Sequence, residues 1–250
     1  MYDIKMKFAA ITLSFVSIFC SAAFAQPADD PAKLQAALDR DKKILQDWPA
    51  LSRYAADNAK LTAPATVVFM GDSITDAWIK RSPKFFADNT GYIDRGISGQ
   101  TTPQMLIRFR PDVIALKPKV VVILAGTNDI AGNTGPMTLD MIEDNFRSMV
   151  ELAKENKIKV VLSSVMPVCD YIRPQTERRP PAQIIALNEW LKDYAAKNKL
   201  VYLDYYTPML DDQKMLQKEI TYDGLHPNEA GYAIMEPLAE KAIAAALHAH

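Results

Sequence analysis

The sequence predicts a three-layer α/β domain built around a five-stranded parallel sheet. Short runs of apolar, mostly β-branched residues recur along the chain, which is typical of strands buried on both faces of a parallel sheet. Longer stretches with apolar residues at helical spacing lie between these runs, and such helices cover both faces of one sheet. A chain of 250 residues that is 49% hydrophobic has the size and composition of one globular domain with at most a small appendage.

Five segments are predicted as strands. Three of them are continuous apolar runs, at residues 66–70, 120–124 and 160–165. Two shorter candidates lie at residues 92–93 and 200–203. Parallel α/β sheets place their functional residues at the carboxyl ends of the strands. The residues that directly follow these segments are therefore where a site is expected.

Four helices are predicted between and after the strands, and each is identified by the residues that begin it. Residues 101–103 place a hydroxyl cap ahead of a proline in the first turn. Thr138 caps a second helix, and a third follows Pro181. The last helix begins near Asn228 and contains Pro237, which we expect to kink it.

The N-terminus has the pattern of a secretory signal peptide. Lys5 and Lys7 precede an apolar run over residues 8–19, and a small-x-small cleavage site ends at Ala25. We expect residues 1–25 to be removed and the mature protein to be periplasmic or secreted. The alternative is a membrane anchor, but the apolar run is shorter than the roughly 20 residues that span a bilayer. No stable membrane anchor is therefore predicted.

Residues 26–63 are interpreted as a short tether and an N-terminal helical arm, and residues 64–250 as the main domain. The arm has apolar residues at near-helical spacing, with Pro49 as a break. Cleavage of the signal peptide would also remove Cys20, which leaves Cys169 as a single cysteine. A single cysteine forms no internal disulfide, so we interpret Cys169 as a packed or loop thiol.

The composition argues against nucleic-acid and metal chemistry. The 29 lysines and arginines balance 30 acidic residues, and no dense basic run is present, so no nucleic-acid partner is predicted. Of three histidines, His248 and His250 lie at the chain end, where residues usually fray. This leaves no plausible zinc cluster, and we predict no metal and no cofactor. A histidine-based site in the folded body must use His226, and the oligomeric state stays open.

Ser73 is the candidate nucleophile and His226 its candidate base. Ser73 follows the first predicted strand, although it lacks the GxSxG elbow of α/β-hydrolases. Asp223 lies three residues before His226, where its carboxylate can turn back to accept a hydrogen bond from the imidazole. The structural alternatives are that Ser73 is a helix cap and that His226 is an exposed residue of a helix N-terminal turn.

Gly99 and Asn128 are the candidate donors to an oxyanion, because they follow the second and third strands. A glycine N–H can approach a substrate closely, and an asparagine amide can donate to negative charge. Their structural alternatives are a loop glycine and an Asx-turn residue. Asp72 and Asp129 stand beside these positions, and for both we favour hydrogen bonding within the loops over a chemical step.

Four motifs in order resemble the SGNH (GDSL-like) hydrolases. Residues 71–75 (GDSIT) resemble the GDSL block, and residues 95–99 (RGISG) resemble the second block of that family. Residues 126–129 (GTND) match the GxND block, and residues 223–227 (DGLHP) match the DxxHP block. The resemblance covers roughly residues 65–247.

The resemblance implies a flavodoxin-like sheet and metal-independent ester hydrolysis. It assigns Ser73, His226 and Asp223 to a catalytic triad. It assigns the oxyanion hole to the N–H groups of Ser73 and Gly99 and to the Asn128 side chain. One small departure is an aspartate at position 94, where many relatives have asparagine.

The substrate expected from the resemblance and the export signal is a small-molecule or glycan ester with a short acyl chain, most simply acetyl. A lysophospholipase, or a lipid esterase like platelet-activating-factor acetylhydrolase, is the alternative. A non-catalytic binding module on the same fold is another. A flavodoxin-like cofactor domain would need a phosphate-binding loop after the first strand, and Asp72-Ser73 is a poor substitute for one.

The proline-rich loop at residues 168–183 has no assigned role. It carries Tyr171, Arg173, Arg178 and Arg179. It either borders the pocket and recognises a polar or anionic group, or it is a solvated loop. The sequence does not choose between the two.

Overall fold

The computed structural model describes residues 30–249. The predicted signal peptide with its cleavage site, and the first part of the tether, lie outside the described residues. The chain divides into two compact units, Met1–Lys42 and Lys43–His250. Helix α1 (Pro31–Gln46) begins in the first unit, and everything described below belongs to the second.

The predicted three-layer α/β class is confirmed, with one parallel sheet at its centre. All five predicted strands are present in the order β2-β1-β3-β4-β5, and every neighbouring pair is parallel. The boundaries differ from the predicted ones by three residues at most. The strands are β1 (Val67–Gly71), β2 (Tyr92–Gly96), β3 (Val120–Leu124), β4 (Lys159–Ser163) and β5 (Val201–Leu203).

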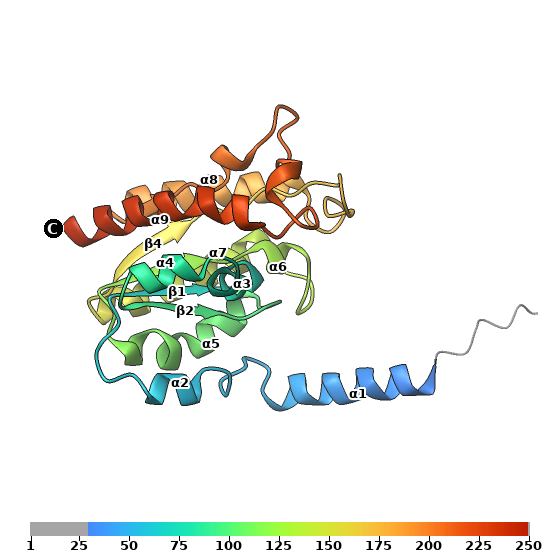
Figure 1. The fold of residues 1–250 in the computed structure, drawn as a ribbon, viewed down its shortest axis with the longest axis horizontal. Coiled ribbons are helices and arrows are strands. Elements are labelled where there is room, and N and C mark those ends of the chain that lie inside the picture. The colour runs from blue at the N-terminus through green and yellow to red at the C-terminus, as the bar shows by residue number, and fades with distance from the viewer. Residues whose placement is uncertain (1–29, 250) are drawn as a thin grey trace, which may run out of the picture. The chain divides into compact units, whose positions relative to one another are not determined.

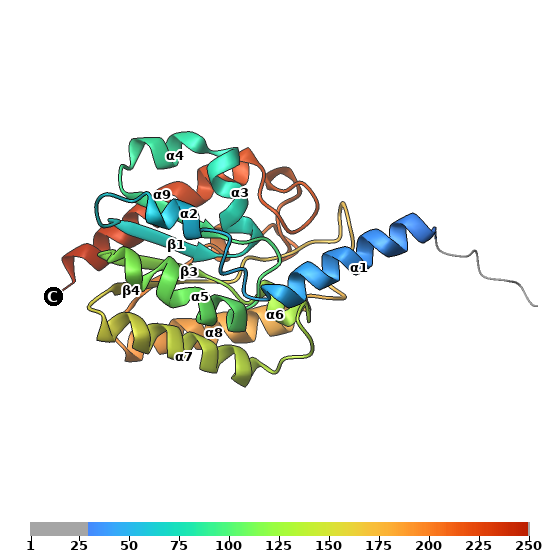
Figure 2. The same ribbon diagram turned by 90° about the horizontal axis from the view of Figure 1, so that it is seen from below.

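Helices cover both faces of this sheet (Figures 1 and 2). One face carries α3 (Ser73–Arg81), α4 (Pro83–Asp88) and α9 (Glu229–His248). The other carries α5 (Thr102–Asp112), α7 (Leu139–Glu155) and α8 (Pro181–Lys197). Shorter elements are α2 (Ala55–Ala59), α6 (Thr127–Ile130), and the 3-10 turns η1 (Ile114–Leu116), η2 (Thr207–Met209) and η3 (Lys218–Ile220).

The predicted helix starts coincide with observed caps. Thr138 accepts a hydrogen bond from the third residue of α7, and Asn228 does the same for α9. Thr101 precedes α5. The predicted kink at Pro237 does not interrupt α9, which continues helically from residue 229 to 248. Helices α3 and α4 were not predicted, because each is short and offers only two or three buried positions.

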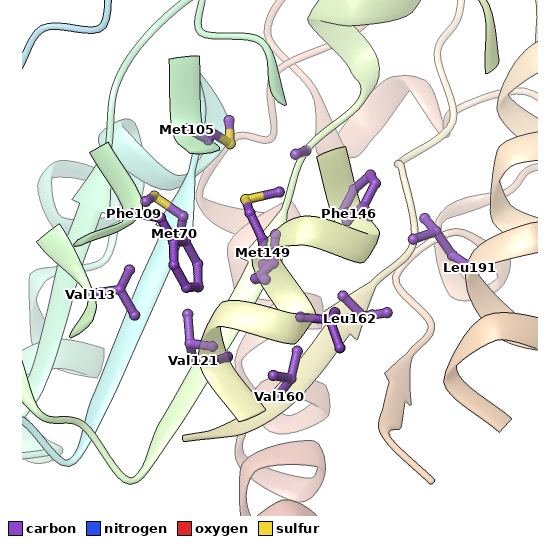
Figure 3. Close-up of a cluster of buried hydrophobic side chains, with 14 of the residues drawn as sticks. Met70, Met105, Phe109, Val113, Val121, Phe146, Met149, Val160, Leu162 and Leu191 are labelled. Carbon is purple, nitrogen blue, oxygen red and sulfur yellow. The ribbon is translucent and has the colours of Figure 1, made fainter. Parts of the chain in front are cut away.

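The core consists of two layers separated by the sheet. Successive strand residues point to opposite faces, so Val68 and Met70 of β1 pack with α5 and α7, while Val67 and Phe69 pack with α3 and α4. Figure 3 shows the first layer, in which Phe109 and Met149 lie over the sheet. Both faces of the sheet are buried, and this leaves its carboxyl edge for a site.

Asp94 is a buried acid in β2. Its Oδ1 accepts a hydrogen bond from the Gly96 N–H at 2.7 Å, and its Oδ2 has no partner among residues 30–249. Burial raises the pKa of Asp94 to about 7. An unfolded aspartate titrates near pH ~3.9, so between about pH 4 and 7 the folded protein keeps a proton that the unfolded chain has lost. Stability therefore falls as the pH rises through this window.

We predict that Asp94→Asn raises the melting temperature more at pH 8 than at pH 4. The neutral amide keeps the acceptor for Gly96 and removes the cost of ionising a buried carboxyl at high pH. A gain of ~1 kcal/mol would raise the melting temperature by roughly 2–4 °C in a protein of this size. Asp212→Asn, at an exposed position, serves as the control. Equal shifts at both pH values would contradict the assignment.

Candidate active site

Three side chains form one hydrogen-bonded chain at the carboxyl edge of the sheet. The Oγ atom of Ser73 lies 2.9 Å from Nε2 of His226, although the two residues are 153 positions apart. The other ring nitrogen, Nδ1, lies 2.8 Å from Oδ2 of Asp223. The structure thus brings together the hydroxyl, the imidazole and the carboxylate that the sequence singles out.

Ser73 is the first residue of α3, and its neighbour caps the helix. Oδ1 of Asp72 accepts a hydrogen bond from the Ile74 N–H at 2.9 Å, so Asp72 is the N-cap. The alternative that Ser73 is the cap is therefore wrong. Because Asp72 satisfies the helix terminus, the Ser73 hydroxyl is left to contact His226.

Asp223 and His226 are held together by a tight turn. Oδ1 of Asp223 accepts hydrogen bonds from the N–H groups of Leu225 and His226 at 3.1 and 2.9 Å. Gly224 within this turn has a φ of +90°, and a Cβ there would lie 2.3 Å from the Cys169 carbonyl oxygen. Only glycine fits both conditions. With the DxxH spacing, one carboxylate oxygen of Asp223 fixes the backbone and the other faces the ring.

The charge state of Asp223 suits a partner for a histidine. Burial pushes its pKa upward, but hydrogen bonds from the backbone and ring of His226 outweigh this effect and hold the pKa below its usual value. Asp223 is therefore ionised at neutral pH. An ionised carboxylate fixes the ring orientation and favours the imidazolium form.

Asn128 is buried, and hydrogen bonds fix its amide. Its Nδ2 donates to the Gln100 carbonyl oxygen at 3.0 Å, and its Oδ1 accepts from Nδ2 of Asn133 at 3.0 Å. Arg179 adds a longer contact to the same Oδ1, at 3.4 Å. Among residues 30–249, the Gln100 carbonyl oxygen is the one acceptor found for this amide group, which has two N–H bonds.

The loop at residues 168–183 supports this asparagine. Arg179 is 5% exposed, and its guanidinium also donates to Oγ1 of Thr127 at 3.1 Å and to Oε1 of Gln175 at 3.0 Å. All three of its acceptors are neutral oxygens. Arg178 donates to the Asn133 side chain at 3.0 Å. Both arginines thus contact the segment that carries Asn128, Arg179 from a buried position and Arg178 from an exposed one.

A second support comes from the segment between α1 and α2, which sequence reasoning missed. The buried Tyr54 hydroxyl donates to the Gly96 carbonyl oxygen. Nε2 of Gln100 donates to the Pro49 carbonyl oxygen at 2.8 Å. These bonds hold both ends of the segment that contains Gly99, whose φ is +82°. No motif marks such contacts, because they depend on residues 42 and 51 positions apart.

The hydroxyl and the imidazole open into a pocket of about 280 Å³. Only two of its lining side chains, Ala77 and Pro227, are aliphatic. The full lining is Ser73, Ala77, Arg81, Ser98, Tyr222, Asp223, His226 and Pro227. No residue of the 168–183 loop is among these, so the alternative in which that loop borders the pocket is not observed for the described residues.

Asp129 and Cys169 make contacts within the fold and do not line the pocket. Asp129 accepts hydrogen bonds from the backbone and hydroxyl of Thr102 at 2.9 and 2.5 Å, which agrees with a loop role. Cys169 is buried in the core.

Within residues 30–249, no group of three metal-binding side chains is found. Among the helices described, none is long and apolar enough to cross a membrane.

The comparison with known families matches residues 69–234 to the GDSL-like Lipase/Acylhydrolase family. This stretch contains all four motifs singled out in the sequence. A solved structure of a candidate acylhydrolase from Bacteroides fragilis is 47% identical and has a TM-score of 0.76. The match covers 80% of this chain and 99% of that one.

Two curated relatives are more distant. An acetylxylan esterase of Geobacillus stearothermophilus is 25% identical over 207 residues, which cover 70% of this chain and 92% of that enzyme. The uncharacterized lipoprotein YqeF of Bacillus subtilis is 32% identical over 85 residues, only 33% of this chain and 35% of that protein. Because the family match spans more than half of the chain and includes every predicted motif, the protein belongs to the GDSL-like Lipase/Acylhydrolase family and is an ester hydrolase.

Proposed function

We propose that this protein is an exported serine esterase that removes short acyl groups, above all acetyl, from carbohydrates. The observation that carries the proposal is the hydrogen-bonded chain from Ser73 through His226 to Asp223 along the wall of a small polar pocket. Acyl transfer by a serine needs a base within hydrogen-bond reach and a group that orients that base. Both conditions are met here.

In the first half of the proposed reaction, Ser73 forms a bond with the acyl carbon. Nε2 of His226 takes the hydroxyl proton as Oγ attacks, and Asp223 stabilises the imidazolium that results. His226 then gives this proton to the alcohol oxygen as the ester C–O bond breaks. The alcohol leaves, and the acyl group stays on Ser73.

In the second half, water repeats the same steps. His226 takes a proton from the water molecule, whose oxygen attacks the acyl carbon. The bond to Ser73 breaks, its Oγ recovers the proton from His226, and the carboxylic acid leaves. Atoms and charges balance without a cofactor, so none is included in the proposal.

The negative charge of both tetrahedral intermediates would rest on three donors. These are the N–H groups of Ser73 and Gly99 and an N–H of the Asn128 amide. Ser73 opens α3, where helix N–H groups carry a partial positive charge. Each donor of this kind is typically worth about 100- to 1000-fold in rate. Arg179 would add a buried positive charge behind Asn128.

The pocket supports a short acyl group and a polar alcohol. A long acyl chain is stabilised by aliphatic walls, and burying charged side chains against it costs free energy. Here Ala77 and Pro227 are the aliphatic lining, whereas Arg81 and Asp223 are charged. This favours acetyl esters over the lipid-esterase alternative. The acetylxylan esterase among the relatives supports the same choice.

We predict that Ser73→Ala lowers kcat for p-nitrophenyl acetate by at least about 1000-fold, because Ser73 carries the hydroxyl that lies within hydrogen-bond distance of His226. The melting temperature should stay close to that of the wild type. Ser148→Ala, in α7 and outside the pocket lining, is the control and should keep full activity. Substantial activity in folded Ser73→Ala protein would reject the proposal.

We predict that Arg179→Gln lowers kcat about tenfold while KM changes little, because the substitution loosens Asn128 and removes a charge that acts in the transition state. Arg173→Gln, in the same loop and exposed, is the control. A structural role alone would lower the melting temperature without lowering the kcat of the folded enzyme. An unchanged kcat in Arg179→Gln would contradict the role assigned to this residue.

For export, we predict that protein recovered from the periplasm or medium begins at Gln26. The basis is the lysine-bearing start, the short apolar run and the small-residue site that ends at Ala25. N-terminal sequencing of the native protein checks this. A product that retains residues 1–25, or that is confined to the cytoplasm, would contradict it.

A further inference from the structure

One wall of the pocket extends along α3, away from the reacting groups. Ser73, Ala77 and Arg81 all line the pocket and are spaced four residues apart. Side chains at this spacing follow one another along the same helix face. Eight residues of helix give a length of about 12 Å. The pocket therefore reaches well beyond the space that an acetyl group would fill.

The far end of this wall faces a fixed aromatic ring. The guanidinium carbon of Arg81 lies 4.4 Å from the ring centroid of Tyr222, a cation–π contact. The Tyr222 hydroxyl donates to Oε1 of Glu229 at 2.5 Å, and Nη1 of Arg81 lies 3.4 Å from the same oxygen. Tyr222 is nevertheless 41% exposed. The ring is thus held in place with much of its surface open.

The reaction itself decides which part of the substrate lies here. His226 has to deliver its proton to the alcohol oxygen, so the alcohol departs on the His226 side of Ser73. Tyr222 belongs to that side, because its N–H donates to the His226 carbonyl oxygen at 3.0 Å and both residues line the pocket. The acyl oxygen points the other way, toward Gly99 and Asn128. The alcohol portion would therefore run along Tyr222 toward Arg81.

We propose that Tyr222, Arg81 and Glu229 form a subsite for a saccharide that is the alcohol portion of the ester; this inference rests on the function proposed above. A sugar ring presents C–H groups that pack on a flat aromatic surface, and hydroxyl groups that bond to a guanidinium and a carboxylate. Tyr222 and Arg81 line this end of the pocket, and Glu229 contacts both of them beside it. A lipid alcohol would offer no ring hydroxyl groups to the Arg81 guanidinium or the Glu229 carboxylate.

The test compares two acetyl esters that differ only in the alcohol. Ethyl acetate has an alcohol too short to reach Tyr222, whereas partially acetylated xylotriose can. We expect Tyr222→Ala to lower the ratio of kcat/KM for acetylated xylotriose to kcat/KM for ethyl acetate by about tenfold or more. Tyr222→Phe keeps the ring and should retain most of that ratio. Acetate release measured by titration at constant pH follows both reactions.

Tyr171→Ala is the matched control. Tyr171 is 39% exposed and its hydroxyl also donates to a carboxylate, that of Asp211 at 2.6 Å, but it does not line the pocket. This variant should keep the wild-type ratio. An unchanged ratio in Tyr222→Ala, or equal losses on both esters, would overturn the subsite, since equal losses indicate a disturbed catalytic turn. Wild-type enzyme that cleaves ethyl acetate but not the sugar ester overturns the subsite and the carbohydrate substrate and leaves the serine-esterase reaction standing, whereas inactivity on both esters overturns that reaction as well.

Discussion

The site depends on placing one imidazole between a hydroxyl and a carboxylate. His226 contacts Ser73 at 2.9 Å and Asp223 at 2.8 Å. Each partner is positioned without using the groups that would react. Asp72 caps α3, which leaves the Ser73 hydroxyl free, and one oxygen of Asp223 binds backbone N–H groups while the other faces the ring. Asp72 and one oxygen of Asp223 thus hold the backbone, while the Ser73 hydroxyl and the other oxygen of Asp223 contact His226.

The candidate oxyanion donors depend on parts of the chain that contribute nothing to the chemistry. The segment before α2 holds Gly96 and Gln100 on either side of Gly99. On the other side, Arg179 reaches from the long loop before α8 to Asn128. Burying an arginine costs free energy, which the carboxylates of Asp72 and Asp223 offset only in part, since the pKa of Arg179 is lowered. This cost is consistent with a charge that acts during the reaction, when an anion forms nearby.

Much of the fold could be predicted because its signals are local. Continuous runs such as Val120–Leu124 predict buried strands, and Thr138 and Asn228 mark helix starts through their own side chains. Helix α3 was missed because its nine residues bury only three side chains, too few for a clear periodic pattern. The motifs predicted which side chains meet, since each lies directly after a strand or within a tight turn.

The supports of the site could not be predicted in this way. Tyr54 and Arg179 make their contacts across 42 and 51 residues, and nothing in their neighbourhood distinguishes a buried partner from an exposed side chain. The capping role of Asp72 instead of Ser73 likewise depends on side-chain direction, because either residue is a good N-cap by type. Which side chain caps the helix, and which distant side chains meet, depends on how the whole chain packs. A short stretch of sequence does not show this.

In the proposed mechanism, Ser73 reacts because His226 accepts its proton. Mass spectrometry after treatment with a fluorophosphonate tests it directly, because only an activated serine reacts quickly with this reagent. We predict one adduct, on Ser73, and a rate of labelling that falls sharply in His226→Ala. An adduct at another residue, or labelling of Ser73 that proceeds equally fast without the imidazole, would contradict the account.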